Sequence, residues 1–249
     1  MYIVIDKFLY VIIFFLLLTT IVFSYKVKDY RFSLSPKEIN IVEEIEKINL
    51  VSRPIVFDAQ RRFLTALYRE KHTGDCDHGK NGMDSCLLIN PKIIVLHMTD
   101  LDDLERSFEY MKEPVLREER EKLISRSYDR LNVSAHYLVD KDGSVYSLMP
   151  DNYMARHAMG VNHLSIAIEN VGFNINGPTR EQIDSNLRLI RYLMKKYNIV
   201  PESIYSHAET GLLRERHSHY FVELEENYFV QKNCGEKLIK EVRKRLNNI

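Results

Sequence analysis

The sequence predicts an α/β fold in which a central mixed β-sheet is flanked by helices and preceded by an N-terminal transmembrane or signal helix and a helical extension. Three observations lead to this fold class. Short apolar runs alternate with segments of helical periodicity, two of the runs flank a hairpin signal, and the first residues form an uncharged apolar stretch. Alternating strands and helices are typical of a sheet covered by helices. We expect three parts, over residues 1–25, 26–89 and 90–249.

The N-terminal apolar stretch runs from Phe8 to Ser24 without a charge and follows Lys7. A helix that crosses a bilayer needs about 17 to 25 apolar residues, and a secretory signal peptide has a similar basic start and apolar run. The cleavage pattern is poor because Phe23 is bulky, which favours an uncleaved anchor, although a removed signal stays open. In both cases the rest of the chain is expected to be exported.

The extension over 26–89 is predicted to be helical. Ser35 and Pro36 are typical of a helix start, and apolar residues recur at helical spacing as far as Ile48. A second helix is expected over 58–71, and the Gly- and Asp-rich segment 73–84 is expected to be a loop.

Residues 90–249 supply the sheet. A continuous apolar run is typical of a strand buried on both faces, and an Asp-Lys-Asp-Gly sequence between two alternating runs indicates a hairpin. Strands are predicted over 93–96, 135–139, 144–148 and 164–169, with a shorter strand-like stretch over 204–206. Helical character is predicted between 101 and 131, over 179–197 and over 228–246.

Charge and cysteine content narrow the function classes. Lys and Arg together number 35, as do Asp and Glu, so nothing indicates a nucleic-acid partner. In an oxidising compartment Cys76 and Cys86 could close a small loop and leave Cys234 free, although no spacing rule fixes this pairing. A zinc knuckle of Cys76, His78 and Cys86 is the alternative, but it lacks a fourth ligand at suitable spacing.

The distribution of histidines is the most informative feature, because seven of the nine lie between His97 and His219. His97 directly follows the strand 93–96, and His207 follows the strand-like stretch 204–206, with His217 and His219 ten and twelve residues later. Three neutral imidazoles with an open fourth position form a known type of catalytic zinc site. A histidine at a strand end is more often a hydrogen-bonded structural residue, so spacing alone leaves both interpretations open.

Glu169 is the second candidate for chemistry, because it ends the predicted strand 164–169. A carboxylate at the edge of a buried strand is costly unless it is paired, hydrogen-bonded or near a metal. The structural alternative is an ion pair with a Lys or Arg of the nearby helix.

Six short blocks of sequence occur in the order found in one known family. They are Ile93-Ile-Val-Leu-His97-Met-Thr, Val133-Ser-Ala-His136-Tyr, Asp140-Lys-Asp-Gly143, Ala155-Arg-His157-Ala, Ser165-Ile-Ala-Ile-Glu169-Asn and Ser206-His207-Ala-Glu. Together they resemble the zinc-dependent N-acetylmuramoyl-L-alanine amidases, which share their fold with the peptidoglycan recognition proteins. Each block is weak alone, and the shared order carries the resemblance.

The resemblance implies a zinc ion with three protein ligands. His97 matches the first ligand and His207 the second. Family members continue with Lys-x-Asp or Lys-x-Cys, in which the Lys assists catalysis and the last residue is the third ligand. Laid on Arg216-His217-Ser218-His219, this pattern makes His219 the third ligand and gives His217 the catalytic place of the Lys, although His217 could be the ligand instead.

The resemblance also implies roles for residues around the zinc. Glu169 matches the carboxylate that serves as general base; other members use a Tyr where this chain has Ala135. His157 matches a pocket residue that faces substrate, and Arg156 and Asn170 are weaker substrate-binding candidates.

The activity implied is hydrolysis of the amide bond between N-acetylmuramic acid and the L-alanine of the peptidoglycan stem peptide, by a zinc-bound water. The expected partners are peptidoglycan or a muropeptide as substrate, and the membrane through the N-terminal apolar segment. The expected location faces the periplasm or cell wall, either anchored or secreted. The alternative is a module on the same fold that binds muropeptides without cutting them, which the unusual third ligand favours.

Overall fold

The computed structural model describes residues 48–76, 82–117, 130–216, 218–225 and 234–246, which all belong to one compact unit, Ile45–Ile249. The predicted N-terminal anchor and the helix expected to start at Ser35 lie outside the described residues, as does His217. Within the described ranges, no helix is both long enough and apolar enough to cross a membrane.

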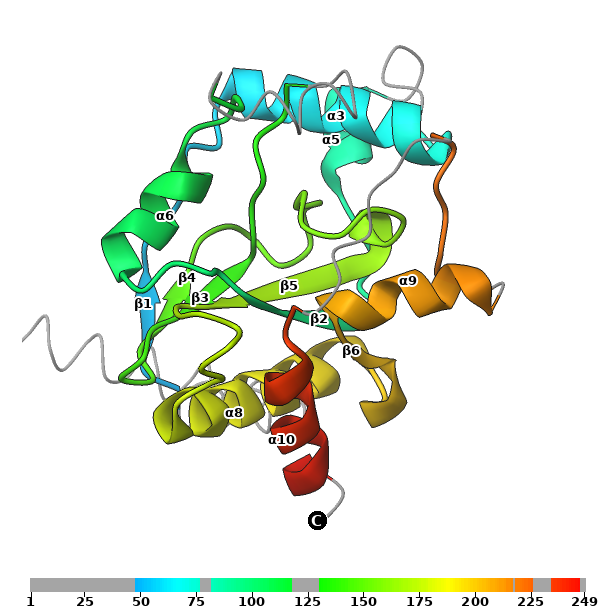
Figure 1. The fold of residues 1–249 in the computed structure, drawn as a ribbon. Helices are drawn as coiled ribbons and strands as arrows, with labels where there is room; N and C mark the ends of the chain where they lie inside the picture. Colours follow the sequence, from blue (N-terminus) through cyan, green and yellow to red (C-terminus); the bar gives the residue numbers. More distant parts are fainter. Residues whose placement is uncertain (1–47, 77–81, 118–129, 217, 226–233, 247–249) are drawn as a thin grey trace, which may run out of the picture. The chain divides into compact units, whose positions relative to one another are not determined.

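A six-stranded mixed sheet forms the centre of the domain, in the order β1-β4-β3-β5-β2-β6 (Figure 1). Only the β3–β4 pair is antiparallel; the other neighbouring pairs are parallel. In chain order the strands are β1 (Leu50–Ser52), β2 (Ile93–Met98), β3 (Tyr137–Val139), β4 (Val145–Ser147), β5 (Ser165–Asn170) and β6 (Ile204–Ser206). The predicted central mixed sheet is therefore confirmed.

The two central strands follow directly from their composition. All six residues of β2 are buried, as expected for a continuous apolar run that is covered on both faces. In β5, only Glu169 is not fully buried. The antiparallel β3–β4 pair is the predicted hairpin, and Gly143 supplies the positive φ of 85° at its turn.

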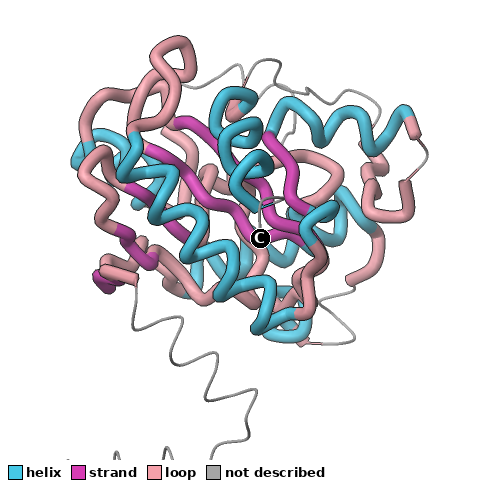
Figure 2. The backbone as a smooth tube through the Cα atoms, turned by 90° about the horizontal axis from the view of Figure 1, so that it is seen from below, coloured by secondary structure: helices cyan, strands magenta, loops and turns pink. Residues whose placement is uncertain are grey.

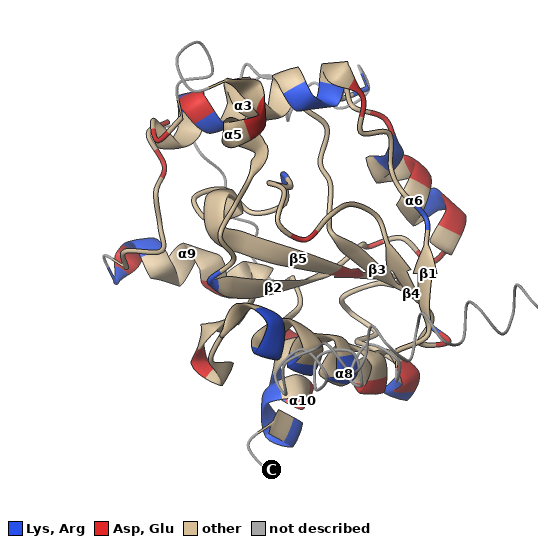
Figure 3. Cartoon of the chain, turned by 180° about the vertical axis from the view of Figure 1, so that it is seen from behind, with Lys and Arg blue, Asp and Glu red and all other residues tan. Residues whose placement is uncertain are grey.

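Helices cover both faces of this sheet. Those of the described residues are α3 (Ala59–Thr73), α5 (Met83–Leu87), α6 (Leu104–Lys112), α8 (Arg180–Tyr197), α9 (His207–Glu215) and α10 (Glu236–Leu246), with short 3₁₀ turns at Asn162–Leu164 and Pro201–Ser203. Figure 2 shows α8 and α10 lying across one face of the strands, and Figure 1 shows α3, α5 and α6 on the opposite side. Charged residues are concentrated on these helices and on the loops (Figure 3).

Local signals explain the helix ends. The predicted helix over 179–197 is confirmed as α8: Thr179 and Gln182 form a capping box at its start, and Asn198 adopts the left-handed conformation at its end. Of the helical character predicted between 101 and 131, the described residues contain α6, which ends at Lys112, while 118–129 lie outside the described residues. Pro114 disfavours helical backbone in the residue before it, Glu113, which is extended. In the predicted C-terminal helix, the described part is α10.

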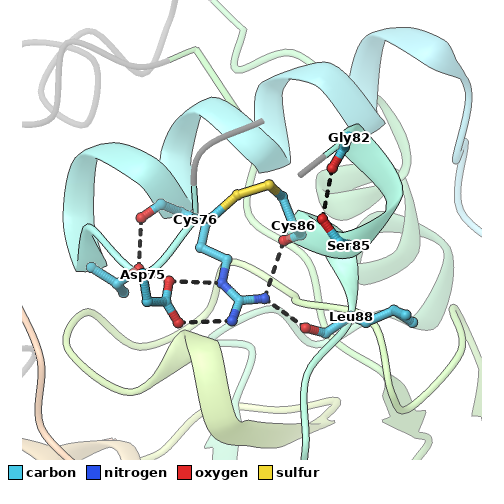
Figure 4. Close-up of a disulfide and its surroundings, with 8 residues drawn as sticks. Asp75, Cys76, Gly82, Ser85, Cys86 and Leu88 are labelled. Carbon is cyan, nitrogen blue, oxygen red and sulfur yellow. Dashed lines mark hydrogen bonds and ion pairs between the residues drawn. A yellow bond between two sulfur atoms is a disulfide. The ribbon is translucent and has the colours of Figure 1, made fainter. Parts of the chain in front are cut away.

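Residues 48–89, which the sequence analysis sets apart as an extension, are joined closely to the sheet. Strand β1 pairs in parallel with β4, and the helix predicted over 58–71 is α3. The disulfide between Cys76 and Cys86 is confirmed, which rules out the zinc knuckle, and Cys234 is buried outside any disulfide (Figure 4).

Candidate active site

Strand register brings the candidate residues to one edge of the sheet. His97 pairs with Glu169 across β2 and β5, and Leu96 pairs with Ser206 across β2 and β6, so His207 directly follows the partner of Leu96. The carboxyl ends of these parallel strands therefore meet where the candidate side chains emerge, which is the usual place for a site in such sheets.

Three potential metal-ligand atoms, from His97, His207 and Cys234, all lie within 4.8 Å of one another. The centroids of the two imidazole rings are 4.6 Å apart, and His97 and Cys234 are buried. This is the only such group of three among the described residues. The structure thus brings together two of the three ligands expected from the sequence and adds a cysteine that the sequence analysis did not place there.

Backbone contacts bring Cys234 to the strand ends. Its carbonyl oxygen accepts a hydrogen bond from Ala208 N at 3.2 Å, next to His207 in the first turn of α9. Gly235 N donates to Asn174 Oδ1 at 3.1 Å. A Cβ atom on Gly235 would lie 2.6 Å from Leu96 O, so the residue after Cys234 approaches β2 as closely as only glycine can.

Burial sets the protonation of these groups. It lowers the pKa of His207 to about 4, and burial, together with repulsion from His207 and His157, holds the pKa of His97 well below its usual value. Burial raises the pKa of the Cys234 thiol to about 12, and the carboxylate of Glu169 adds to this rise. Two neutral imidazoles, and a cysteine that gives up its proton when a metal binds, supply the nitrogen and sulfur donors that zinc prefers, and three ligands leave a fourth position open. The residues therefore fit a catalytic zinc ion.

His219 does not take part in this group. Its side chain is exposed, and its ring lies 4.1 Å from that of Tyr220. The missed signal is Lys232-Asn233-Cys234, a second match to the Lys-x-Cys pattern. Arg216-His217-Ser218-His219 lies closer to His207 along the chain than this segment does, but in the fold it is Cys234 that lies beside His207.

Glu169 faces the same site. Its Oε1 lies 3.9 Å from His97 Nδ1, and its side chain is 18% exposed. Its other oxygen, Oε2, is buried without a hydrogen-bond partner among the described residues. Burial, with a smaller contribution from Asp100, raises the pKa of Glu169 to about 8. An ion pair with a nearby Lys or Arg, the structural alternative, is not found for it within the described ranges.

The predicted substrate-binding residues fall into different places. Arg156 and His157 line the cavity described below, and both ring nitrogens of His157 are within hydrogen-bond distance of protein atoms, His97 Nε2 at 3.0 Å and Ser165 Oγ at 2.8 Å. Asn170 does not line the cavity. Its fully buried amide donates to His97 O and accepts from Asn186 Nδ2, which gives it a structural place between β2 and α8.

A cavity of about 360 Å³ opens beside the cluster. The three potential ligands and Glu169 form one part of its wall, and Ser107, Tyr110 and Met111 of α6 form another. Asp100, which has a positive φ of 52°, lies at the exposed rim. The space is of the size that holds a small-molecule or peptide group.

A carboxylate with a raised pKa, beside nitrogen and sulfur atoms that could hold a metal and next to a cavity, is the arrangement that metal-dependent hydrolases use. The family identity follows from a comparison of sequences. The model of the N-acetylmuramoyl-L-alanine amidase family matches residues 88–224, and the chain belongs to this family. The match ends before Cys234 and begins after α3.

Solved structures of amidases and endolysins are similar to the chain. The endolysin amidase LysCS from Clostridium intestinale URNW is 27% identical over 64% of this chain and 85% of that chain, with a TM-score of 0.42. A mutant endolysin from Bacillus subtilis is 21% identical over 68% of this chain and 94% of that chain, with a TM-score of 0.43. The amidase AmiD from E. coli, in complex with anhydro-N-acetylmuramic acid-L-Ala-D-gamma-Glu-L-Lys, is 22% identical over 49% of this chain and 50% of that chain, with a TM-score of 0.37. No curated protein matches the sequence.

Proposed function

We propose that the chain hydrolyses the amide bond between N-acetylmuramic acid and the L-alanine of the peptidoglycan stem peptide, at a zinc site formed by His97, His207 and Cys234. The observation that carries this proposal is the convergence of three ligand atoms within 4.8 Å of one another, beside Glu169 and an open cavity. Family membership supports the reaction class.

Held by His97, His207 and Cys234, a zinc ion would supply the Lewis acidity that polarises the scissile carbonyl and makes a water molecule more acidic. Glu169 is placed to take the proton of the attacking water and to pass it to the departing amine. Its raised pKa makes it a stronger base than an exposed glutamate. The partnerless Oε2 leaves one oxygen of this carboxylate for that exchange.

Lys232 takes the place that the sequence analysis gave to His217. It stands two residues before Cys234 and so matches the Lys of the family's Lys-x-Cys pattern; Lys232 and His217 both lie outside the described residues. A lysine retains its positive charge to higher pH than a histidine. We assign it the stabilisation of the negative charge that develops on the carbonyl oxygen.

The location of the protein is part of the same proposal. The apolar segment Phe8–Ser24 would hold the chain at the outer face of the membrane, or direct its secretion if it is cleaved. The Cys76–Cys86 disulfide is in keeping with export, because such bonds persist in oxidising compartments. Peptidoglycan or released muropeptides would then be within reach of the site.

Digestion of purified peptidoglycan tests the function. The zinc-loaded chain should release stem peptides with a free N-terminal L-alanine, identified by mass, while the glycan strands stay intact. Removing zinc with a chelator should stop the release, and adding zinc back should restore it. Glycan fragments in place of free peptides, or no release at all, would contradict the proposal.

The alternative is a module that binds muropeptides without cutting them. A histidine, His219, in place of the family's Asp or Cys as the third ligand favours this alternative. The presence of Cys234 in the cluster removes that irregularity. The digestion separates the two functions, because a binding module would sediment with peptidoglycan and release nothing.

A further inference from the structure

A chain of hydrogen bonds fixes which nitrogen of His97 faces the site. The Ser165 hydroxyl donates to Val161 O at 2.6 Å, so towards His157 Nε2, 2.8 Å away, it accepts. A neutral imidazole that donates from Nε2 accepts at Nδ1, and His157 Nδ1 lies 3.0 Å from His97 Nε2. His97 therefore carries its proton on Nε2 and presents the lone pair of Nδ1.

That lone pair faces the catalytic side of the cavity, since Nδ1 is the atom 3.9 Å from Glu169 Oε1. A metal-binding histidine usually donates its other ring N–H to a partner that fixes its tautomer and ring orientation. His157 is that partner here. Because both of its ring nitrogens are engaged in the relay, we interpret His157 as a positioning residue rather than a substrate contact.

The loop that carries His157 is held by Asn162, whose Oδ1 accepts from the backbone N–H groups of His157 and Ala158, both at 2.9 Å. Asn162 Nδ2 donates to the hydroxyl of Tyr68 at 3.1 Å. Asn162 is 4% exposed and Tyr68 2% exposed, so these hydrogen bonds are shielded from water. Tyr68 belongs to α3, which precedes the residues that match the family.

Helix α3 is itself tied to the segment before His157. The Cys76–Cys86 disulfide joins the residues after α3 to α5, and Arg69 donates from α3 to Leu88 O at 2.6 Å (Figure 4). Leu87 O in turn accepts from Met154 N at 2.7 Å. The two helices are thus fastened to the strand-like segment that leads into the His157 loop.

We propose that α3 helps to orient a metal ligand: Tyr68, acting through Asn162 and His157, holds His97 in the orientation that binds zinc. This inference rests on the proposed function, because it takes the zinc site as given. It assigns a role to a segment that lies outside the family match.

The test compares two Tyr→Phe variants of the full-length chain. Tyr68→Phe removes the hydroxyl that accepts the hydrogen bond from Asn162 Nδ2. The matched control is Tyr137→Phe, which removes another buried hydroxyl, one that donates to Asp151 Oδ2. The zinc dissociation constant is measured by competition with a chromophoric chelator, and the melting temperature is measured for each variant.

We expect Tyr68→Phe to weaken zinc binding by about 10-fold, the lower end of the range for outer partners of metal ligands, while Tyr137→Phe keeps the wild-type dissociation constant. Ser165→Ala, which frees the tautomer of His157 directly, should weaken zinc binding in the same direction. Equal dissociation constants in the wild type, Tyr68→Phe and Ser165→Ala would overturn the inference and leave the proposed function standing. A wild-type chain that binds no zinc would overturn both.

Discussion

His97 and Glu169 are direct neighbours in the sheet: the parallel register of β2 and β5 pairs them, and His97 Nδ1 lies 3.9 Å from Glu169 Oε1. Backbone pairing therefore places the proposed metal ligand directly beside the proposed base.

Glu169→Gln tests the role of the base. The amide has the same shape but cannot accept the proton of the attacking water, so we expect release of stem peptides to fall by about 10² to 10⁴-fold. Zinc content should stay at the wild-type value, because Glu169 is not one of the three clustered ligands. Turnover close to the wild-type rate in a zinc-loaded Glu169→Gln protein would remove the residue from its role.

Lys232→Met tests the second match to the Lys-x-Cys pattern. Loss of a charged group that stabilises the developing negative charge should lower the rate constant for cleavage by about 10² to 10³-fold. The matched control is Lys240→Met, which removes an exposed lysine of α10 and should cleave at the wild-type rate. If both variants cleave equally well, Lys232 has no part in the reaction.

Gly235→Ala tests how the thiol reaches the strand ends. An added Cβ would lie 2.6 Å from Leu96 O, so the backbone beside Cys234 must move, and we expect zinc binding to weaken by about 10-fold or more. Gly82→Ala is the control, because its φ of 78° is close to the 79° of Gly235 but an added Cβ meets no atom within 4 Å. Both variants place an alanine at positive φ, which costs roughly 1–3 kcal/mol of backbone strain. Weaker zinc binding is expected in Gly235→Ala alone, and the same zinc affinity in both would contradict the account.

Asp75 gives the stability of α3 a dependence on pH. Burial alone would raise its pKa, but hydrogen bonds from Arg69 and Thr73 outweigh it and hold the pKa below the usual value. A folded-state pKa below the unfolded value means that Asp75 stabilises the fold above the unfolded pKa, about 4, and that this contribution is lost as pH falls through the lower folded pKa.

Asp75→Asn should therefore lower the melting temperature at pH 7 by a small amount, since a half-exposed ion pair is worth under about 1 kcal/mol. Below about pH 4 the difference from the wild type should shrink, because Asp75 becomes protonated and is then uncharged, as asparagine is. Thermal unfolding of both proteins across this range is the measurement. A difference that stays constant down to acid pH would show that the charge of Asp75 is not the cause.

Much of the scaffold could be predicted from the sequence, because local patterns determine it. The apolar run of β2 and the capped, periodic α8 are both recognisable without a structure. Strand ends made His97, His207 and Glu169 candidates, and the six ordered blocks that resemble one family made them predicted site residues.

Cys234 could not be found in this way, since its approach to His97 depends on the close contact of Gly235 with β2 rather than on spacing along the chain. The place of His157 likewise depends on tertiary contacts, because His157 meets His97 across 60 residues and Asn162 meets Tyr68 across 94. Periodicity carries no information about such contacts.

A measurement of which residue is the third zinc ligand tests the central claim most directly. Zinc per chain, measured side by side in purified Cys234→Ala and His219→Ala proteins, should fall far below one in Cys234→Ala and stay close to one in His219→Ala. The reverse result, with zinc retained without the thiol and lost without the His219 imidazole, would contradict the assignment of the site to His97, His207 and Cys234.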